Sequence, residues 1–225
     1  MKKRTFIVAL IICMVAIIGI GSLAYFQASK NLTNYFAVAG VSDPTDPSAT
    51  IDPNALFSIK LEETDIRDGG KTETGNTYTD ILPGTTLTKD PTVTNTGKYD
   101  AWVRVKVSVT DFTAWSKACA KHDITDLADI FNGHDATLWV SGEADNTYDA
   151  ATDTYTFVYY YKDKVAPKGT ATLFTSVTIP KQFDIQDMAS LATFQIKITG
   201  EAIQAANTGD TAKEAFRTPG NFIQE

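Results

Sequence analysis

The most regular alternation of apolar and polar residues lies between Ala101 and Thr110, in the stretch AWVRVKVSVT. Valine occupies every second position there, at Val103, Val105, Val107 and Val109. A period of two with β-branched residues predicts a β-strand. Because the other face carries mostly polar side chains, we expect an antiparallel sheet with one face on the core and the other in water.

Weaker runs of the same period predict further strands: residues 56–61, 91–94, 137–140, 155–161, 170–179 and 193–203. Turn-forming triplets such as Leu82-Pro83-Gly84 and Asn95-Thr96-Gly97 separate them. Many short strands between such turns predict an all-β fold, an antiparallel β-sandwich or barrel. Of the successive residues Tyr159, Tyr160 and Tyr161, the middle one faces the opposite side of its strand, so at least one belongs to the core.

The segment from residue 112 to about 134 changes period. Apolar residues recur there at helical spacing in two groups: Trp115, Ala118 and Cys119, then Leu127, Ile130 and Phe131. We expect a short helical insertion of two helices between strands. The second helix would be capped by Thr125 or Asp126 and ended by Gly133.

The N-terminal sequence has the three-part layout of a secretory signal. A basic start precedes an apolar run over residues 6–20, and Ser22 and Ala24 supply small side chains at positions −3 and −1 of a cleavage site. We therefore expect a signal peptide over residues 1–24, cut by a signal peptidase before Tyr25. The uncharged stretch is long enough to span a bilayer, at about 20 residues, so an uncleaved anchor is the alternative. After the cut we expect no membrane attachment.

Residues 25–40 form a short segment ahead of the main body. This segment carries side chains that a solvated tail would not expose: Tyr25, Phe26, Leu32, Tyr35, Phe36 and Val38. Residues 41–53 are rich in Asp, Pro, Ser and Thr, which predicts a linker. The β-sandwich domain is expected over residues 54–225. The apolar segment must be buried somewhere, on this domain or on another.

The composition excludes some partners. The chain has 20 basic and 27 acidic residues, and three of the basic residues precede the expected cut, so the remainder is strongly acidic. This charge repels nucleic acid and anionic lipid, so we expect no nucleic-acid binding. Cys13 lies in the signal and Cys119 is the single cysteine after it. We therefore expect no internal disulfide and a buried Cys119.

No motif for catalysis is present in the sequence. The two histidines, His122 and His134, are twelve positions apart, and there is no His-Glu-x-x-His. Catalytic zinc needs three protein ligands and an open position, so these histidines are only weak metal candidates, and surface histidines are expected instead. Residues 142–153 are acidic but lack the glycine and final glutamate of a calcium loop, which favours a solvated hairpin. We expect neither a catalytic residue nor a cofactor.

Three features follow one another along the chain. The signal ends in LAYF, residues 81–107 read ILPGTTLTKDPTVTNTGKYDAWVRVKV, and residues 200–216 read GEAIQAANTGDTAKEAF. In this order they resemble the TasA/camelysin family of secreted Gram-positive proteins, over nearly the whole chain from Gly21 to Phe216. The resemblance implies a jelly-roll-like β-sandwich, a dedicated signal peptidase, and a place in the extracellular matrix or on the cell surface.

The best-known members of that family are subunits of biofilm fibres, in which the mature N-terminal segment pairs as a strand with the next subunit. The resemblance therefore implies self-association, or assembly with related matrix subunits, through residues 25–40. Docking of this segment on its own domain as an ordinary edge strand is the alternative. Two other functions stay open: a secreted camelysin-like metallopeptidase, and an accessory surface protein or adhesin that does not polymerise.

Overall fold

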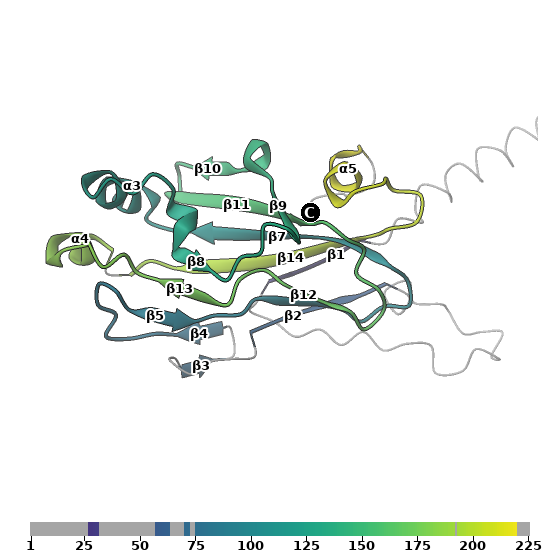
Figure 1. Cartoon of the computed structure of the whole chain (residues 1–225), viewed down its shortest axis with the longest axis horizontal. Helices are drawn as coiled ribbons and strands as arrows, with labels where there is room; N and C mark the ends of the chain where they lie inside the picture. Colours follow the sequence, from purple (N-terminus) through teal and green to yellow (C-terminus); the bar gives the residue numbers. More distant parts are fainter. Residues whose placement is uncertain (1–26, 32–56, 64–69, 73–74, 192, 220–225) are drawn as a thin grey trace, which may run out of the picture.

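A computed structural model describes residues 27–31, 57–63, 70–72, 75–191 and 193–219. Within these residues the chain is mostly antiparallel β-strand, with three short α-helices outside the sheets (Figure 1). The sheets share one main apolar core. The expected all-β antiparallel sandwich is confirmed, whereas the jelly-roll strand order stays a prediction.

The larger sheet has six strands among the described residues. Its main path runs β1 (Gln27–Asn31), β14 (Ile196–Gln204), β7 (Ala101–Val109), β11 (Thr154–Tyr161) and β10 (Thr147–Asp149), and β9 (Trp139–Ser141) also pairs with β11. The register joins distant parts of the sequence, since Gln27 lies opposite Ile203 and Ile198 lies opposite Val107. The strand with the most regular alternation, β7, is therefore an interior strand of this sheet.

The second layer is built from two three-stranded sheets. One contains β12 (Thr170–Thr172), β6 (Thr92–Asn95) and β2 (Ile59–Glu62), and the other contains β5 (Thr86–Thr88), β13 (Ser176–Thr178) and β8 (Phe131–Asn132). A two-stranded ribbon, β3 (Gly70–Thr72) with β4 (Gly75–Thr77), completes the strands. Residues 170–179, expected as one strand, form two, because the chain between Thr172 and Ser176 passes from one sheet to the other.

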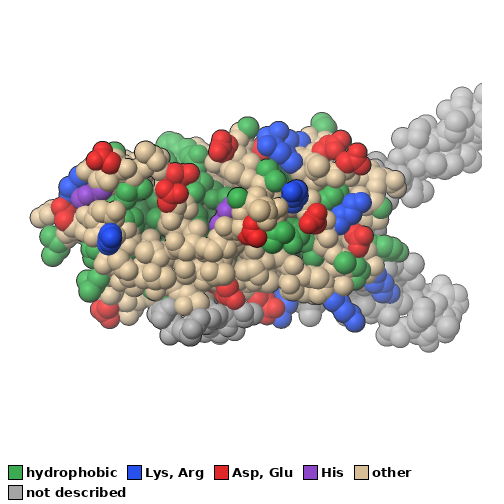
Figure 2. Space-filling model, in the orientation of Figure 1, with side chains coloured by type: hydrophobic (Ala, Val, Ile, Leu, Met, Phe, Trp, Pro, Cys, Tyr) green, Lys and Arg blue, Asp and Glu red, His purple; other side chains and the backbone are tan. Residues whose placement is uncertain are grey.

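The outer face of the second layer carries hydroxyl groups. Thr86 and Thr178 lie opposite each other with their side-chain oxygens 2.8 Å apart, and Thr92 and Thr172 repeat this arrangement at 2.8 Å. Figure 2 shows a broad area with few charged side chains over these strands. Threonine satisfies both demands of an exposed strand, because its branched carbon fits the pleat and its hydroxyl meets water.

The main core lies between the two layers. The four valines of β7 are fully buried, as the alternation predicts. The layers approach closely at Gly200 of β14, where an added Cβ atom would lie 3.1 Å from Val93 Cγ2. Tyr159 and Tyr160 are both buried, and Cys119 is buried and free, which confirms those expectations.

The prediction that the second face of β7 lies in water is wrong for the first half of the strand. Trp102 and Arg104 are only 3% and 7% exposed. The reason is the helix α5 (Ala212–Arg217), which packs on this outer face (Figure 1). A second apolar cluster forms under the helix: Trp102, Val158, Tyr160, Ile203, Ala205, Ala212, Ala215 and Phe216. The middle of the larger sheet is thus buried on both faces.

Charged groups also hold α5 in place. The Arg104 guanidinium donates to Glu201 and lies 4.4 Å from the centre of the Phe216 ring. Arg217 donates through Nε and Nη2 to the carboxylate of Asp145, with the shortest distance 2.8 Å. Ionic and apolar contacts therefore act together on this face.

The helical insertion is only partly as expected. The helix α3 (Phe112–Lys121) buries Trp115 and Cys119, but the second element is a single 3-10 turn, Leu127–Ile130. Asp126 caps this turn, as expected, by accepting from the backbone N–H of Ala128 at 2.8 Å. The turn stays short because the next residues form β8 in the second layer.

Two other short helical elements lie within the described ranges. The helix α4 (Ile185–Ser190) begins at a capping box formed by Asp184 and Asp187. A 3-10 turn, Glu143–Asp145, precedes β10.

Candidate functional site

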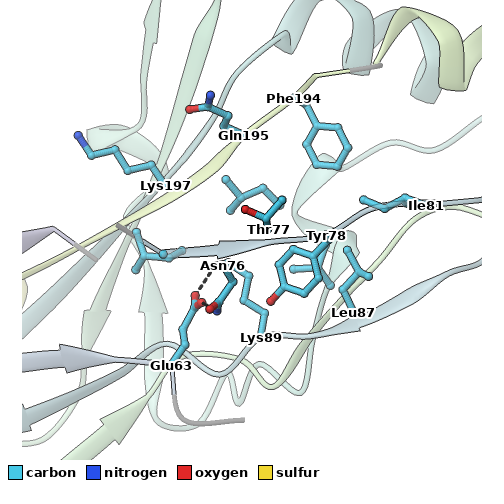
Figure 3. Close-up of a pocket in the computed structure, with 14 residues that line it drawn as sticks. Glu63, Asn76, Thr77, Tyr78, Ile81, Leu87, Lys89, Phe194, Gln195 and Lys197 are labelled. Atoms are coloured by element: carbon cyan, nitrogen blue, oxygen red, sulfur yellow. Dashed lines mark hydrogen bonds and ion pairs between the residues drawn. The ribbon is translucent and has the colours of Figure 1, made fainter. Parts of the chain in front are cut away.

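A groove of about 470 Å³ lies between β14 and the second layer (Figure 3). Ile196 and Ile198 of β14 line one side. Strand β4, the loop after it, strands β5 and β13, and the residues directly after β2 and β5 line the opposite side. Figure 3 shows apolar side chains gathered at one end, near Phe194, and polar side chains at the other, near Glu63. The groove can therefore hold a segment with both apolar and polar side chains.

Among the described strands, the edge of β14 beside this groove is paired over only part of its length. β1 pairs with residues 199–203 and stops at Asn31. Among the described strands, none pairs on this side with residues 196–198, whereas β7 continues along the other side. The N–H of Thr110 donates to the C=O of Gln195, so the next backbone groups, those of Ile196, are directed away from β7. Such groups at a sheet edge can accept another strand.

The apolar end of the groove is held in shape by its neighbours. The ring of Phe194 packs edge-on against Trp115, with ring centres 5.1 Å apart. The hydroxyl of Tyr78 donates to the C=O of Thr88 at 2.9 Å, which fixes the ring beside Leu87. This end therefore presents a preformed surface to aromatic and aliphatic side chains.

The polar end of the groove holds a buried ion pair. The Lys89 ammonium donates to Glu63 Oε1, and the two side chains are 9% and 2% exposed. The Nδ2 of Asn76, on β4, donates to Glu63 Oε2 at 2.5 Å. Removing either charge would leave the other buried without a partner of opposite charge, which is strongly destabilising.

Comparison of the chain with protein-family models, curated proteins and solved structures finds no match. No helix within the described ranges is long and apolar enough to cross a membrane. The function must therefore be inferred from the groove, the sheet edge and the sequence.

The residues predicted to act in processing and assembly lie outside the described residues: Ser22, Ala24, Tyr25, Phe26, Leu32, Tyr35, Phe36 and Val38. Within the predicted segment 25–40, the structure describes only the backbone pairing of β1. β1 pairs with β14 of the same chain, which is the arrangement expected if the segment docks on its own domain as an edge strand. The signal, linker and cleavage predictions stay predictions.

The structure does not bring the two histidines together. His122 Nε2 lies 2.8 Å from Asp187 Oδ2, whereas the His134 ring packs against Tyr159 with ring centres 5.2 Å apart. Burial lowers the pKa of His134. The pKa of Asp187 is held below its usual range, chiefly by the N–H of Asp184 and then by His122. In the part of the chain described, no three His, Cys, Asp or Glu side chains are placed to hold a metal ion.

Two other candidates from the sequence have structural explanations. The acidic stretch 142–153 forms the 3-10 turn and the β10–β11 hairpin, where the Asp149 carboxylate accepts from the hydroxyl of Thr152 at 2.8 Å and from the N–H of Ala151 at 2.9 Å. These bonds lower the pKa of Asp149. Burial raises the pKa of the Cys119 thiol, which opposes formation of a nucleophilic thiolate.

The polar residues of the groove are not among those predicted from the sequence. A signal for two of them was present, because Glu63 follows Ile59 and Leu61 at the inward position of its alternation. Lys89 follows Leu87 in the same way. A charged residue at an inward position predicts a buried partner of opposite charge, but it does not identify that partner.

Proposed function

We propose that the mature chain is a secreted structural protein of the extracellular matrix or cell surface, and that its copies assemble into fibres by strand donation. Residues 25–40 of one copy would pair with the β14 edge of the next copy. The observation that carries this proposal is that the described strands leave residues 196–198 of that edge unpaired, beside a groove with an apolar end. The resemblance to the TasA/camelysin family supports the same function.

Exchange of the N-terminal strand is physically simple in this fold. β1 lies at the edge of the larger sheet and pairs there with β14 alone among the described strands. A neighbouring copy offers the identical segment, so it can replace β1 without changing any backbone contact. The predicted linker, residues 41–53, would allow the segment to leave its own domain.

Continuing the register of β1 gives the proposed pairs beyond Asn31. Because Gln27 lies opposite Ile203, the same antiparallel register sets Leu32 opposite Ile198 and Phe36 opposite Phe194. Opposite residues share a face of the sheet, so both apolar side chains would enter the groove. Burying each contributes about 1.5–3 kcal/mol, in addition to the backbone hydrogen bonds of the added strand.

Electron microscopy of purified protein tests the proposal. A chain beginning at Tyr25 should form fibres, and a chain beginning at Val41 should not. Because the shorter chain also lacks β1, the Leu32→Glu variant of the longer chain provides a second test, with Thr33→Glu as its control on the other face. Equal fibres from all four proteins, or a longer chain that stays monomeric at every concentration, would contradict strand donation.

A protein that binds preformed matrix fibres without extending them would instead be an accessory subunit. Sedimentation of the longer chain with such fibres, in the absence of self-assembly, would give that result.

A further inference from the structure

At the polar end of the groove, two charged residues occupy positions that face the protein interior. Glu63 and Lys89 stand where the alternation of their strands would otherwise place apolar side chains. A well-packed apolar pair at such positions is often as stable as a buried ion pair, or more stable. Stability alone therefore does not explain the pair. The best-attested role of a buried polar group in an interface is to fix the register of the partner.

The Lys89 ammonium retains capacity for a further hydrogen bond. It has three donors, and among the described residues Glu63 is the acceptor that it meets. Both residues line the groove together with Asn76, and Figure 3 shows these three side chains side by side. An occupant that offers both an acceptor and a donor at this point would satisfy the group, whereas an apolar occupant would cover the remaining N–H donors of Lys89 without giving them an acceptor.

We infer that Lys89, Glu63 and Asn76 set the register of the donated strand by binding the side-chain amide of Asn34 from a second copy of the chain. The inference rests on the proposed function. The register that pairs Gln27 with Ile203 and Asn31 with Thr199 sets Asn34 opposite Ile196, which lines the groove. An asparagine amide has an oxygen to accept from Lys89 and an NH₂ to donate to Glu63.

The neighbours of Asn34 match the rest of the groove. Leu32 and Phe36 lie two positions to either side, so they share the face of Asn34 and meet Ile198 and Phe194. A slip of two residues would set Leu32 or Phe36 against the ion pair. A slip of one residue would turn all three side chains out of the groove. One register therefore satisfies both ends of the groove.

Disulfide linking between two populations of the chain beginning at Tyr25 tests the inference. One population carries Thr33→Cys and the other carries Lys197→Cys, since these positions are opposite each other in the inferred register and Lys197 is exposed. Mixing the two populations before oxidation should give a linked dimer that neither forms alone. Native Cys119 is buried and can stay unchanged.

Two substitutions then probe the polar group. Asn34→Leu in the donor population, or Lys89→Met in the acceptor population, should lower the yield of linked dimer roughly tenfold, as expected for loss of a charge-assisted hydrogen bond. Linking to Thr199→Cys or Gln195→Cys, which reports a slip of two residues, should rise. Asn31→Leu makes the same chemical change at a position whose side chain lies on the other face of the strand from Asn34. It should leave the yield of linked dimer unchanged.

The outcomes separate the inference from the proposed function. No linked dimer in any combination would overturn strand donation itself, and the inference with it. A linked dimer whose yield and register are the same in Asn34→Leu and Lys89→Met would overturn the inference alone. Because Asn34→Leu leaves the acceptor population unaltered, misfolding of the groove cannot produce its expected result.

Discussion

The contact of α5 with the outer face of the larger sheet makes Phe216→Ala a demanding test of the fold. Phe216 is 7% exposed, lies 4.4 Å from the guanidinium carbon of Arg104, and has its ring centre 6.1 Å from that of Tyr160. Loss of the buried ring removes about 2–3 kcal/mol of apolar burial. Loss of a largely desolvated cation–π contact adds about 1 kcal/mol. We therefore expect the free energy of unfolding to fall by about 3 kcal/mol.

Urea unfolding at pH 7, followed by tryptophan fluorescence and by circular dichroism, measures this change. Trp102 lies in the same cluster as Phe216, and it contributes to the emission together with Trp115 and Trp139. Ile185→Ala is the matched control, because Ile185 is 78% exposed and its truncation should change stability by less than about 0.5 kcal/mol. A loss below about 1 kcal/mol in Phe216→Ala, with an unchanged denaturant slope, would refute the packing of α5 on the sheet.

Three further changes test other parts of the structure. Glu201→Gln removes the carboxylate that pairs with the buried Arg104, so urea unfolding should show a loss of about 3–5 kcal/mol; a neutral result would contradict a buried pair. Burial lowers the pKa of His134, so the unfolded chain binds its proton more readily and stability should rise with pH up to about 6.5–7. In urea unfolding at several pH values, His134→Gln should reduce this increase in the free energy of unfolding with pH. An increase as steep as that of the wild type would contradict the burial of His134. Gly133 has φ +74° and an added Cβ would lie 2.2 Å from Thr175 Oγ1, so Gly133→Ala should lower stability by about 2 kcal/mol or more; an unchanged thermal midpoint would contradict this geometry.

The local alternation of apolar and polar residues predicted where strands form, but it did not predict which other elements cover them. The pattern around Val105 predicts a strand and its buried face correctly, because a period of two depends only on neighbouring residues. The burial of Trp102 and Arg104 depends on α5, more than a hundred residues later, and no local pattern contains that contact. The start of α5 did have a local signal, since Thr211 and Glu214 form a Ser/Thr-x-x-Glu start whose hydroxyl caps the helix.

The groove was the least predictable feature. Its walls come from strands that are adjacent only in the folded chain, and its polar end joins Glu63 with Lys89 across 26 positions. The inward charges were visible in the alternation, but their pairing required the register of the second layer. The weak zinc candidates show the converse, because His122 and His134 are near in sequence and have different partners in the structure.

The register of the larger sheet also determines when the chain can fold. β14 joins β1 to β7, yet it is synthesised long after both of them. Until residue 204 is available, β1 has no described strand to pair with and β7 lacks one neighbour. Contacts of such long sequence separation form slowly. A chain with the predicted signal peptide would therefore stay unfolded during most of its passage through a membrane channel, and the sheet would close only on the far side.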